Sequence, residues 1–212
     1  MQADFWHQVW QQDQLGFQLA EAHPMLRAHL SCLPKSEAVF VPLCGKSPDL
    51  HLLARQYLVV GAELSPIACR DFFHEAQLAA SRSTIDRFTL WQSAGYRLWQ
   101  GDFFALPKNA VQDCHLIYDR AALIALPASM RQQYVQKLQA LIPRATLLLI
   151  SLEYPEHEKQ GPPFAVMASE IAKLFEFANI ELCGIRNLTG LGFARRKFET
   201  SQLVEKSWLI RW

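Results

Sequence analysis

Short hydrophobic runs alternate along this chain with longer stretches in which apolar residues recur at helical spacing. The short runs predict β-strands, because they are rich in β-branched and other apolar residues and are bounded by turn residues. The longer stretches predict helices, and one of them follows Ser65, a good N-cap residue, and Pro66, which suits a first helical turn. The expected strands cover 38–42, 57–63, 96–100, 114–118, 145–152, 180–185 and 203–210, and the expected helices cover 48–55, 66–77, 128–141 and 169–178.

This alternation predicts an α/β fold, in which a mostly parallel sheet is covered by helices on both faces. The run at 145–152 is apolar at most positions, as burial on both faces requires. The last two strands are joined by a glycine-containing segment without helical periodicity, so we expect them to form an antiparallel hairpin at one edge of the sheet. Because ligands bind such a sheet at the carboxyl ends of its strands, candidate site residues are sought in the loops that follow them.

The composition is that of a globular protein: 50% of the 212 residues are hydrophobic, 19% are charged, and the formal net charge is +1. We expect a single domain over residues 1–212, because neither a linker nor a repeat divides the chain. The balanced charge provides no basic surface for a nucleic-acid backbone, so we expect no nucleic-acid partner.

Cysteines and apolar runs indicate the compartment. The five cysteines are scattered and form neither a disulfide framework nor a metal-binding pattern, so no metal is expected. The longest apolar run, 145–152, is far shorter than the ~20 residues of a membrane-spanning helix, and residues 1–10 lack the pattern of a signal peptide. We therefore expect a cytoplasmic protein with no membrane partner, and a monomer, since nothing in the sequence calls for a dimer.

The loop after the first expected strand has one glycine, Gly45. A phosphate-binding P-loop is excluded, because its pattern needs a glycine where this chain has Phe40, and the glycine-rich dinucleotide fingerprint is absent as well. Glu63 closes the next strand, about twenty residues later, where a carboxylate can accept hydrogen bonds from ribose hydroxyls. The alternative is a solvated carboxylate at a strand end. We favour a ribose ligand, because the sequence is apolar up to this single charge.

Two later loops offer further candidates. Asp102 and Phe103 suit an adenine amino group and ring, or alternatively a helix cap and a core side chain. Arg120 ends an apolar strand, and its guanidinium can bind a ligand carboxylate or form an ion pair with Asp119 or another carboxylate. We find no catalytic Ser/His/Asp or Cys/His arrangement, and we do not expect Cys44 to act as a nucleophile.

Several motifs, in order along the chain, resemble the thiopurine S-methyltransferase family. They are Phe5-Trp6-His7-x-x-Trp10, Gly16-Phe17, Val41-Pro-Leu-Cys-Gly-Lys46, Val60-Gly-Ala-Glu-Leu-Ser65, Gly101-Asp-Phe-Phe104, Tyr118-Asp-Arg-Ala-Ala-Leu123 and Gly161-Pro-Pro-Phe164. The resemblance implies a class I methyltransferase, Rossmann-like fold: a doubly wound, mostly parallel sheet of about seven strands with one antiparallel edge strand. It also implies an N-terminal helical lid at residues 1–34 on a core at 35–212, with S-adenosyl-L-methionine as methyl donor.

The same resemblance implies roles for individual residues. Cofactor binding falls to Trp10, Leu43, Gly45, Glu63, Asp102, Phe103 and Arg120, and the acceptor site is lined by Phe17 and Phe164. Arg120 is also expected to stabilise a thiolate, without a general base. The implied reaction is direct in-line methyl transfer to an aromatic or heterocyclic thiol such as a thiopurine.

Two segments leave the acceptor open. The family often has Gly-Phe-His-Gln where this chain has Gly16-Phe-Gln18-Leu19, so a ring nitrogen is lost next to Phe17. The basic segment 192–197 contains Arg195 and Arg196, which suit either an anionic acceptor or a solvated loop. Alternative functions are methylation of a selenium or tellurium species, a halide or a hydroxyl, nicotinamide-dependent redox chemistry, and cofactor binding without catalysis.

Overall fold

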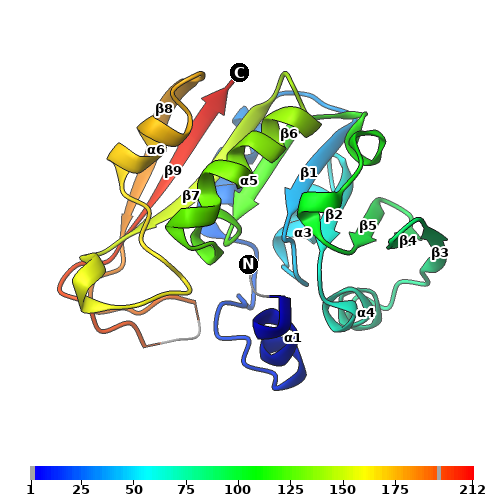
Figure 1. The fold of residues 1–212 in the computed structure, drawn as a ribbon, viewed down its shortest axis with the longest axis horizontal. Helices are drawn as coiled ribbons and strands as arrows, with labels where there is room; N and C mark the ends of the chain where they lie inside the picture. Colours follow the sequence, from blue (N-terminus) through cyan, green and yellow to red (C-terminus); the bar gives the residue numbers. More distant parts are fainter. Residues whose placement is uncertain (1–2, 195–196) are drawn as a thin grey trace.

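The computed structural model describes residues 3–194 and 197–212, which form one mixed sheet of nine strands with helices on both faces (Figure 1). The strand order is β3-β4-β5-β2-β1-β6-β7-β9-β8. The strands are β1 (Ala38–Pro42), β2 (Leu58–Glu63), β3 (Ser81–Ile85), β4 (Phe88–Ser93), β5 (Tyr96–Gln100), β6 (Cys114–Arg120), β7 (Thr146–Glu153), β8 (Asn179–Asn187) and β9 (Val204–Arg211).

The pairing of the strands confirms the expected fold class. β5, β2, β1, β6 and β7 run parallel, whereas β9 lies antiparallel between β7 and β8. The expected hairpin at this edge is therefore present as β8 and β9. Two further strands, β3 and β4, extend the opposite edge in antiparallel order beyond β5 and were not expected from the sequence.

The four helices that the periodicity predicts are present, with small differences at their ends, and α1 and α2 lie in the N-terminal segment that the resemblance implies to be a helical lid. They are α1 (Ala3–Gln11), α2 (Pro24–His29), α3 (Asp49–Leu53), α4 (Pro66–Glu75), α5 (Ala128–Leu141) and α6 (Ala168–Leu174). Ser65 caps α4, since its hydroxyl accepts from the Ala68 amide at 3.3 Å. α6 ends four residues before the expected boundary at Ala178, because the chain leaves helical geometry at the fully buried Phe175.

Two hydrophobic cores flank the sheet, one on each face. Successive strand residues point to opposite faces, so Phe40 of β1 packs in the core beneath α5 and α6, while Val39 and Val41 pack in the core beneath α2, α3 and α4. This arrangement leaves the ends of the strands as the place where ligands can reach the sheet.

The helix α1 lies at the carboxyl ends of the central parallel strands, at the bottom of Figure 1. It is therefore placed to cover the loops that follow β1, β2 and β6. Within residues 3–194 and 197–212, no helix is both long and apolar enough to cross a membrane.

Candidate active site

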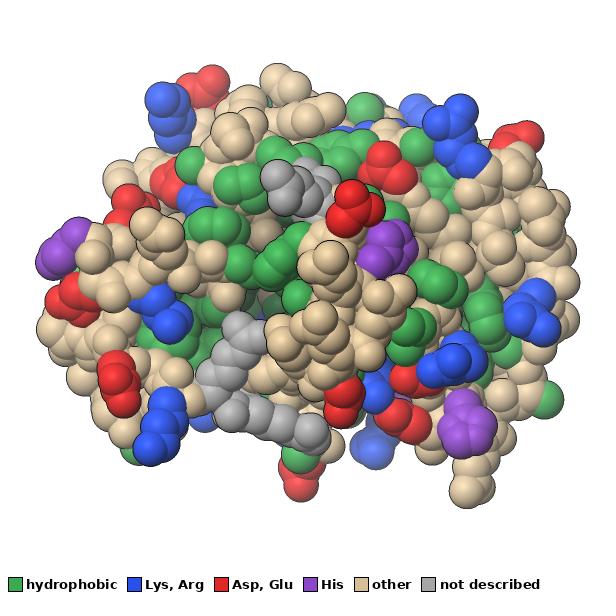
Figure 2. Space-filling view, turned by 60° about the horizontal axis from the view of Figure 1, so that its bottom comes forward, with side chains coloured by type: hydrophobic (Ala, Val, Ile, Leu, Met, Phe, Trp, Pro, Cys, Tyr) green, Lys and Arg blue, Asp and Glu red, His purple; other side chains and the backbone are tan. Residues whose placement is uncertain are grey.

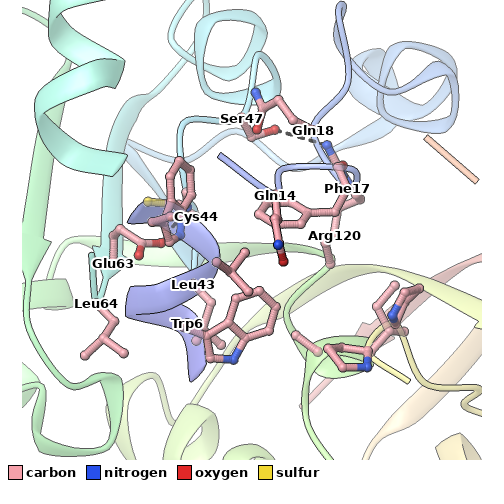
Figure 3. Close-up of a pocket in the computed structure, with 18 of the residues that line it drawn as sticks. Trp6, Gln14, Phe17, Gln18, Leu43, Cys44, Ser47, Glu63, Leu64 and Arg120 are labelled. Atoms are coloured by element: carbon pink, nitrogen blue, oxygen red, sulfur yellow. Dashed lines mark hydrogen bonds between the residues drawn. The ribbon is translucent and has the colours of Figure 1, made fainter. Parts of the chain in front are cut away.

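A cavity of about 260 Å³ lies at the carboxyl ends of β1, β2 and β6. Figure 2 views this side of the molecule and shows hydrophobic side chains gathered around a hollow. The cavity is lined by Phe5, Trp6, Val9, Trp10, Gln14, Phe17, Gln18, Leu43, Cys44, Gly45, Ser47, Glu63, Leu64, Arg120, Ala121, Ile124, Ala125, Pro162, Pro163 and Phe193. Aromatic and aliphatic side chains dominate. The acidic Glu63 and the basic Arg120 lie on opposite sides of the close-up in Figure 3.

The loop after β1 brings its backbone close to the lid. Leu43 and Gly45 both have positive φ angles, +48° and +55°, which turns the chain sharply at the strand end and suits glycine best. A Cβ atom at Gly45 would lie 3.3 Å from Cζ2 of Trp10. Trp10 of α1 thus packs directly on this loop, and the missing side chain at Gly45 permits the contact.

Glu63, at the end of β2, is held by this same loop. One carboxylate oxygen accepts from the Gly45 amide at 2.8 Å, and the other accepts from the Ser65 amide at 2.7 Å. Burial raises the pKa of the carboxyl above its ordinary value, while the backbone donors of Ser65, Gly45 and Leu64 lower it in part. The side chain is fixed in place, and each oxygen keeps a further lone pair for a ligand hydroxyl.

The side chain of Arg120, at the end of β6, is 5% exposed and makes three hydrogen bonds with the protein. Its Nε donates to Asp49 at 3.2 Å, Nη1 to the Phe17 carbonyl at 3.1 Å and Nη2 to the Ser47 hydroxyl at 3.4 Å. The carboxylate that pairs with it is therefore Asp49 of α3, and not the neighbouring Asp119. The guanidinium joins the lid, the first loop and α3 at one point of the cavity wall.

The lid is tied to the first loop by an unexpected residue. Gln18 donates from Nε2 to the Lys46 carbonyl at 2.8 Å, and Phe17 meets Trp6 and Trp10 edge to face at 5.9 and 6.0 Å. The amide at position 18, which departs from the common family pattern, thus fastens the lid to the first loop. Phe17 is left facing the cavity.

Three predicted site residues do not line the cavity. Phe103 is 3% exposed and packs in the core against Phe40 and Tyr134, so its ring cannot cover a ligand from this position. Asp102 is exposed and caps the next turn by accepting from the Phe104 amide at 3.0 Å. These are the helix-cap and core roles that the sequence analysis left open as alternatives.

Phe164 also lies behind the wall rather than in it. Its amide donates to the Ile124 carbonyl at 2.7 Å, and the guanidinium of Arg131 lies 5.8 Å from its ring centroid. The neighbouring Pro162 and Pro163 line the cavity instead. The Gly-Pro-Pro-Phe motif therefore reaches the site through its prolines, with Phe164 as their anchor.

The cavity includes residues that the sequence analysis did not select. Gln14, Leu64, Ile124 and Phe193 line it from four different segments. Leu64 directly follows Glu63 and is the one that the sequence could have indicated. Phe193 comes from the loop between β8 and β9, whose segment 192–197 the sequence analysis considered for an acceptor because of its basic residues and not because of this side chain.

Cys44 lines the cavity but is not suited to act as a nucleophile. Burial, and next the nearby charge of Glu63, raise the pKa of its thiol well above the ordinary value, so it stays protonated and unreactive. The basic pair Arg195 and Arg196, which the sequence analysis singled out, lies outside the described residues.

Comparisons with known proteins identify the family. The sequence model of thiopurine S-methyltransferase matches residues 1–211. A thiopurine S-methyltransferase of Pseudomonas paraeruginosa is 50% identical over 175 residues, which cover 81% of this chain and 80% of the relative. Another, of Pseudomonas fluorescens, is 39% identical over 215 residues, which cover 100% of this chain and 99% of the relative.

The chain belongs to the thiopurine S-methyltransferase family. Its fold agrees with this: an S-adenosylmethionine-dependent methyltransferase of Anabaena variabilis superposes with a TM-score of 0.65 at 16% identity, covering 99% of this chain and 95% of that one. The expectations of family, class I fold and enzyme class are confirmed. The chain is a methyltransferase of the class that uses S-adenosylmethionine as methyl donor.

Proposed function

We propose that this family member transfers the methyl group of S-adenosylmethionine to an aromatic or heterocyclic thiol, such as a thiopurine, by in-line transfer to the thiolate. The observation that carries the proposal is the cavity itself. A buried carboxylate, Glu63, and a buried guanidinium, Arg120, face one apolar and largely aromatic space at the ends of β2 and β6. A polar nucleoside–amino acid donor and a flat apolar acceptor are both suited to such a space.

The residues on the donor side fit the cofactor. Glu63 is fixed by two backbone amides and can accept from ribose hydroxyls. Gly45 lets Trp10 pack closely on the loop, and Leu43 and Leu64 offer apolar contacts to a ligand. Asp102 follows β5 beside the end of β2, since the Gly101 amide donates to the Glu63 carbonyl at 2.8 Å. It caps the next turn in this structure, and its second carboxylate oxygen is our proposed acceptor for the adenine amino group.

The chain's own residues have little covalent chemistry to perform. When bound, S-adenosylmethionine supplies a methyl group on a sulfonium, which a thiolate attacks without prior activation. Trp6, Trp10 and Phe17 exclude water from the cavity, and the apolar walls align the acceptor. Alignment of this kind contributes about 7–11 kcal/mol to lowering a barrier.

Arg120 favours the reactive form of the acceptor. A positive charge beside a thiol stabilises the thiolate and lowers the pKa of the acceptor. Among the described residues that line the cavity we find no side chain suited to act as the base, since both oxygens of Glu63 accept from backbone amides and Cys44 stays protonated. We therefore propose that the acceptor enters as a thiolate, or loses its proton to water, beside Arg120.

A labelled-methyl transfer assay tests this function with matched acceptors. We expect transfer to thiophenol and to a thiopurine, and none to phenol, which has the same shape but a far less acidic and harder nucleophile. Transfer confined to selenium or tellurium oxyanions, to halide or to hydroxyl groups would contradict the thiol assignment. Binding of S-adenosylhomocysteine without turnover of any acceptor would indicate a cofactor-binding module.

A further inference from the structure

Asp49 is a buried carboxylate that the proposed reaction does not use directly. It opens α3, has 0% exposure, and does not line the cavity. Its Oδ1 accepts from the His23 amide at 2.6 Å, and its Oδ2 accepts from the Tyr118 hydroxyl at 3.0 Å and from Nε of Arg120 at 3.2 Å. A buried charge with this many donors is held in a single orientation.

The Asp49–Arg120 pair holds both ends of one segment of the lid, residues 17–23. At the first end, Nη1 of Arg120 donates to the carbonyl of Phe17, and at the other end the amide of His23 donates to Asp49. Between them, Gln18 is tied to the first loop through the Lys46 carbonyl. The segment cannot lift from the cavity without breaking contacts to this ion pair.

The same pair fixes the plane of the guanidinium. Nε is held by Asp49, Nη1 by the Phe17 carbonyl and Nη2 by the Ser47 hydroxyl. Because a guanidinium is planar and rigid, three fixed donors determine its orientation. Stability alone is a weak reason for a buried ion pair, since apolar residues of similar volume often serve equally well.

We propose that Asp49 is a positioning residue that couples closure of the 17–23 segment to alignment of Arg120 with the acceptor thiolate. When the segment is docked, Arg120 is oriented; when it lifts, the guanidinium loses the Phe17 carbonyl as an acceptor and Asp49 loses the His23 amide as a donor. The inference rests on the proposed thiol methylation for its catalytic half. Its structural half, the docking of residues 17–23 by Asp49, stands on geometry alone.

The first test is Asp49→Asn, which keeps the shape and removes the charge. One position of the carboxylate becomes an amide NH₂ that must face a donor, either His23 or the Tyr118–Arg120 pair. We expect amide hydrogen exchange in residues 17–23 to accelerate about tenfold or more, because a charge-assisted hydrogen bond is lost. We expect kcat for an aromatic thiol to fall about tenfold with a smaller change in KM, as for a contact that matters mainly in the transition state.

Ser151→Ala is the matched control for lost stability. Ser151 is fully buried in β7 and accepts from Nε1 of Trp208 at 2.8 Å, so the variant also leaves a buried polar group without its partner. We expect exchange in residues 17–23 and kcat to stay near wild type in this variant. Equal losses of kcat in both variants, with unchanged exchange at 17–23, would overturn the proposal.

A second pair of variants isolates the amide of His23 and does not depend on Asp49→Asn folding. His23→Ala and His23→Pro both remove the imidazole, which contacts Glu205 at 3.1 Å, but only proline also removes the amide donor to Asp49. Proline fits the backbone here, because His23 has a φ of −58°. We expect faster exchange at residues 17–22 and a lower kcat in His23→Pro than in His23→Ala.

The outcomes separate this inference from the proposed function. If the wild-type enzyme methylates thiols and Asp49→Asn matches it in kcat and in exchange, the inference is wrong and the function stands. If the wild type methylates no thiol while Asp49→Asn still loosens residues 17–23, the proposed function fails and the docking role of Asp49 stands. Equal behaviour of His23→Pro and His23→Ala would overturn the docking role.

Discussion

Three consecutive residues of β6, Tyr118, Asp119 and Arg120, illustrate how strand geometry decides which charges meet. Residues two apart in a strand share a face, so Tyr118 and Arg120 both reach Asp49 on the side of α3. Asp119 points to the other face, where it accepts from Tyr134 at 2.6 Å and from the Ala122 and Leu123 amides. The sequence neighbour of Arg120 is therefore not its partner.

The burial of Asp119 predicts a pH dependence of stability. Burial raises the pKa of its carboxyl from 3.8 to about 6, against the lowering effect of its hydrogen-bond donors. Between about pH 4 and pH 6, Asp119 is therefore protonated in the native protein but ionised in the unfolded chain. The contribution of Asp119 to the unfolding free energy consequently declines as the pH rises through this range and is lost above about pH 6.

Asp119→Asn removes this titration. We expect the unfolding free energy of wild type, relative to that of the variant, to fall by roughly 2–3 kcal/mol from pH 4 to pH 7. Urea unfolding at several pH values measures the difference, and Glu205, whose pKa is lowered, is present in both proteins and cancels. Parallel pH profiles for the two proteins would show that Asp119 titrates normally.

Among the secondary-structure elements, strands with continuous buried apolar runs were predictable, whereas the fully exposed β3 was not. The strands β1 and β7 carry buried runs that the pattern reveals directly. β3 was missed because all five of its residues are exposed, so no apolar alternation marks it. It exists because it pairs with β4 across a tight turn at Asp86, which has a φ of +51°.

The lid helix α1 shows how weakly an element can be attached. Of its nine residues only Val9 and Trp10 are buried. In a core that unfolds only with the whole protein, a buried Trp→Ala change lowers the unfolding free energy by about 3–5 kcal/mol. For Trp10 we expect a smaller loss of unfolding free energy, because α1 can undock while the rest of the fold stays intact.

Trp10→Ala should therefore separate binding from global stability. We expect the affinity for S-adenosylhomocysteine to fall about tenfold or more, and Tm to change by less than about 2 °C. Calorimetric titration and thermal unfolding measure the two effects, with the exposed Gln11→Ala on the same helix as control. A large loss of Tm with unchanged affinity would place Trp10 in the core of the fold rather than in the lid.

At the scale of the whole molecule, the cavity is assembled from segments far apart in the sequence. Strand ends supply Glu63 and Arg120, and these positions were predictable because the carboxyl ends of parallel strands meet at one edge of the sheet. Phe193 and Gln14 reach the cavity only through the packing of loops, which has no local pattern. Phe103 was predicted to contact the cofactor but packs in the core. An aromatic residue near a strand end can pack either in the cavity or in the core, and the sequence alone does not distinguish the two.

A ligand that binds this cavity binds only the native state, so its binding should raise the unfolding free energy. A ligand present at 100 times its Kd adds about 2.7 kcal/mol to the unfolding free energy, which raises Tm by roughly 5–11 °C at about 2–4 °C per kcal/mol for a chain of this size. We expect this shift with S-adenosylhomocysteine and none with NAD, which the first loop cannot hold without further glycines.

Glu63→Gln tests the donor site in the same assay. The substitution places a side-chain NH₂ group opposite a backbone N–H, so the variant should need about tenfold more S-adenosylhomocysteine for the same shift in Tm. The exposed Glu181→Gln is the control and should behave as wild type. A shift with NAD alone would contradict the assignment of the donor site, and an unchanged ligand dependence in Glu63→Gln would remove Glu63 from it.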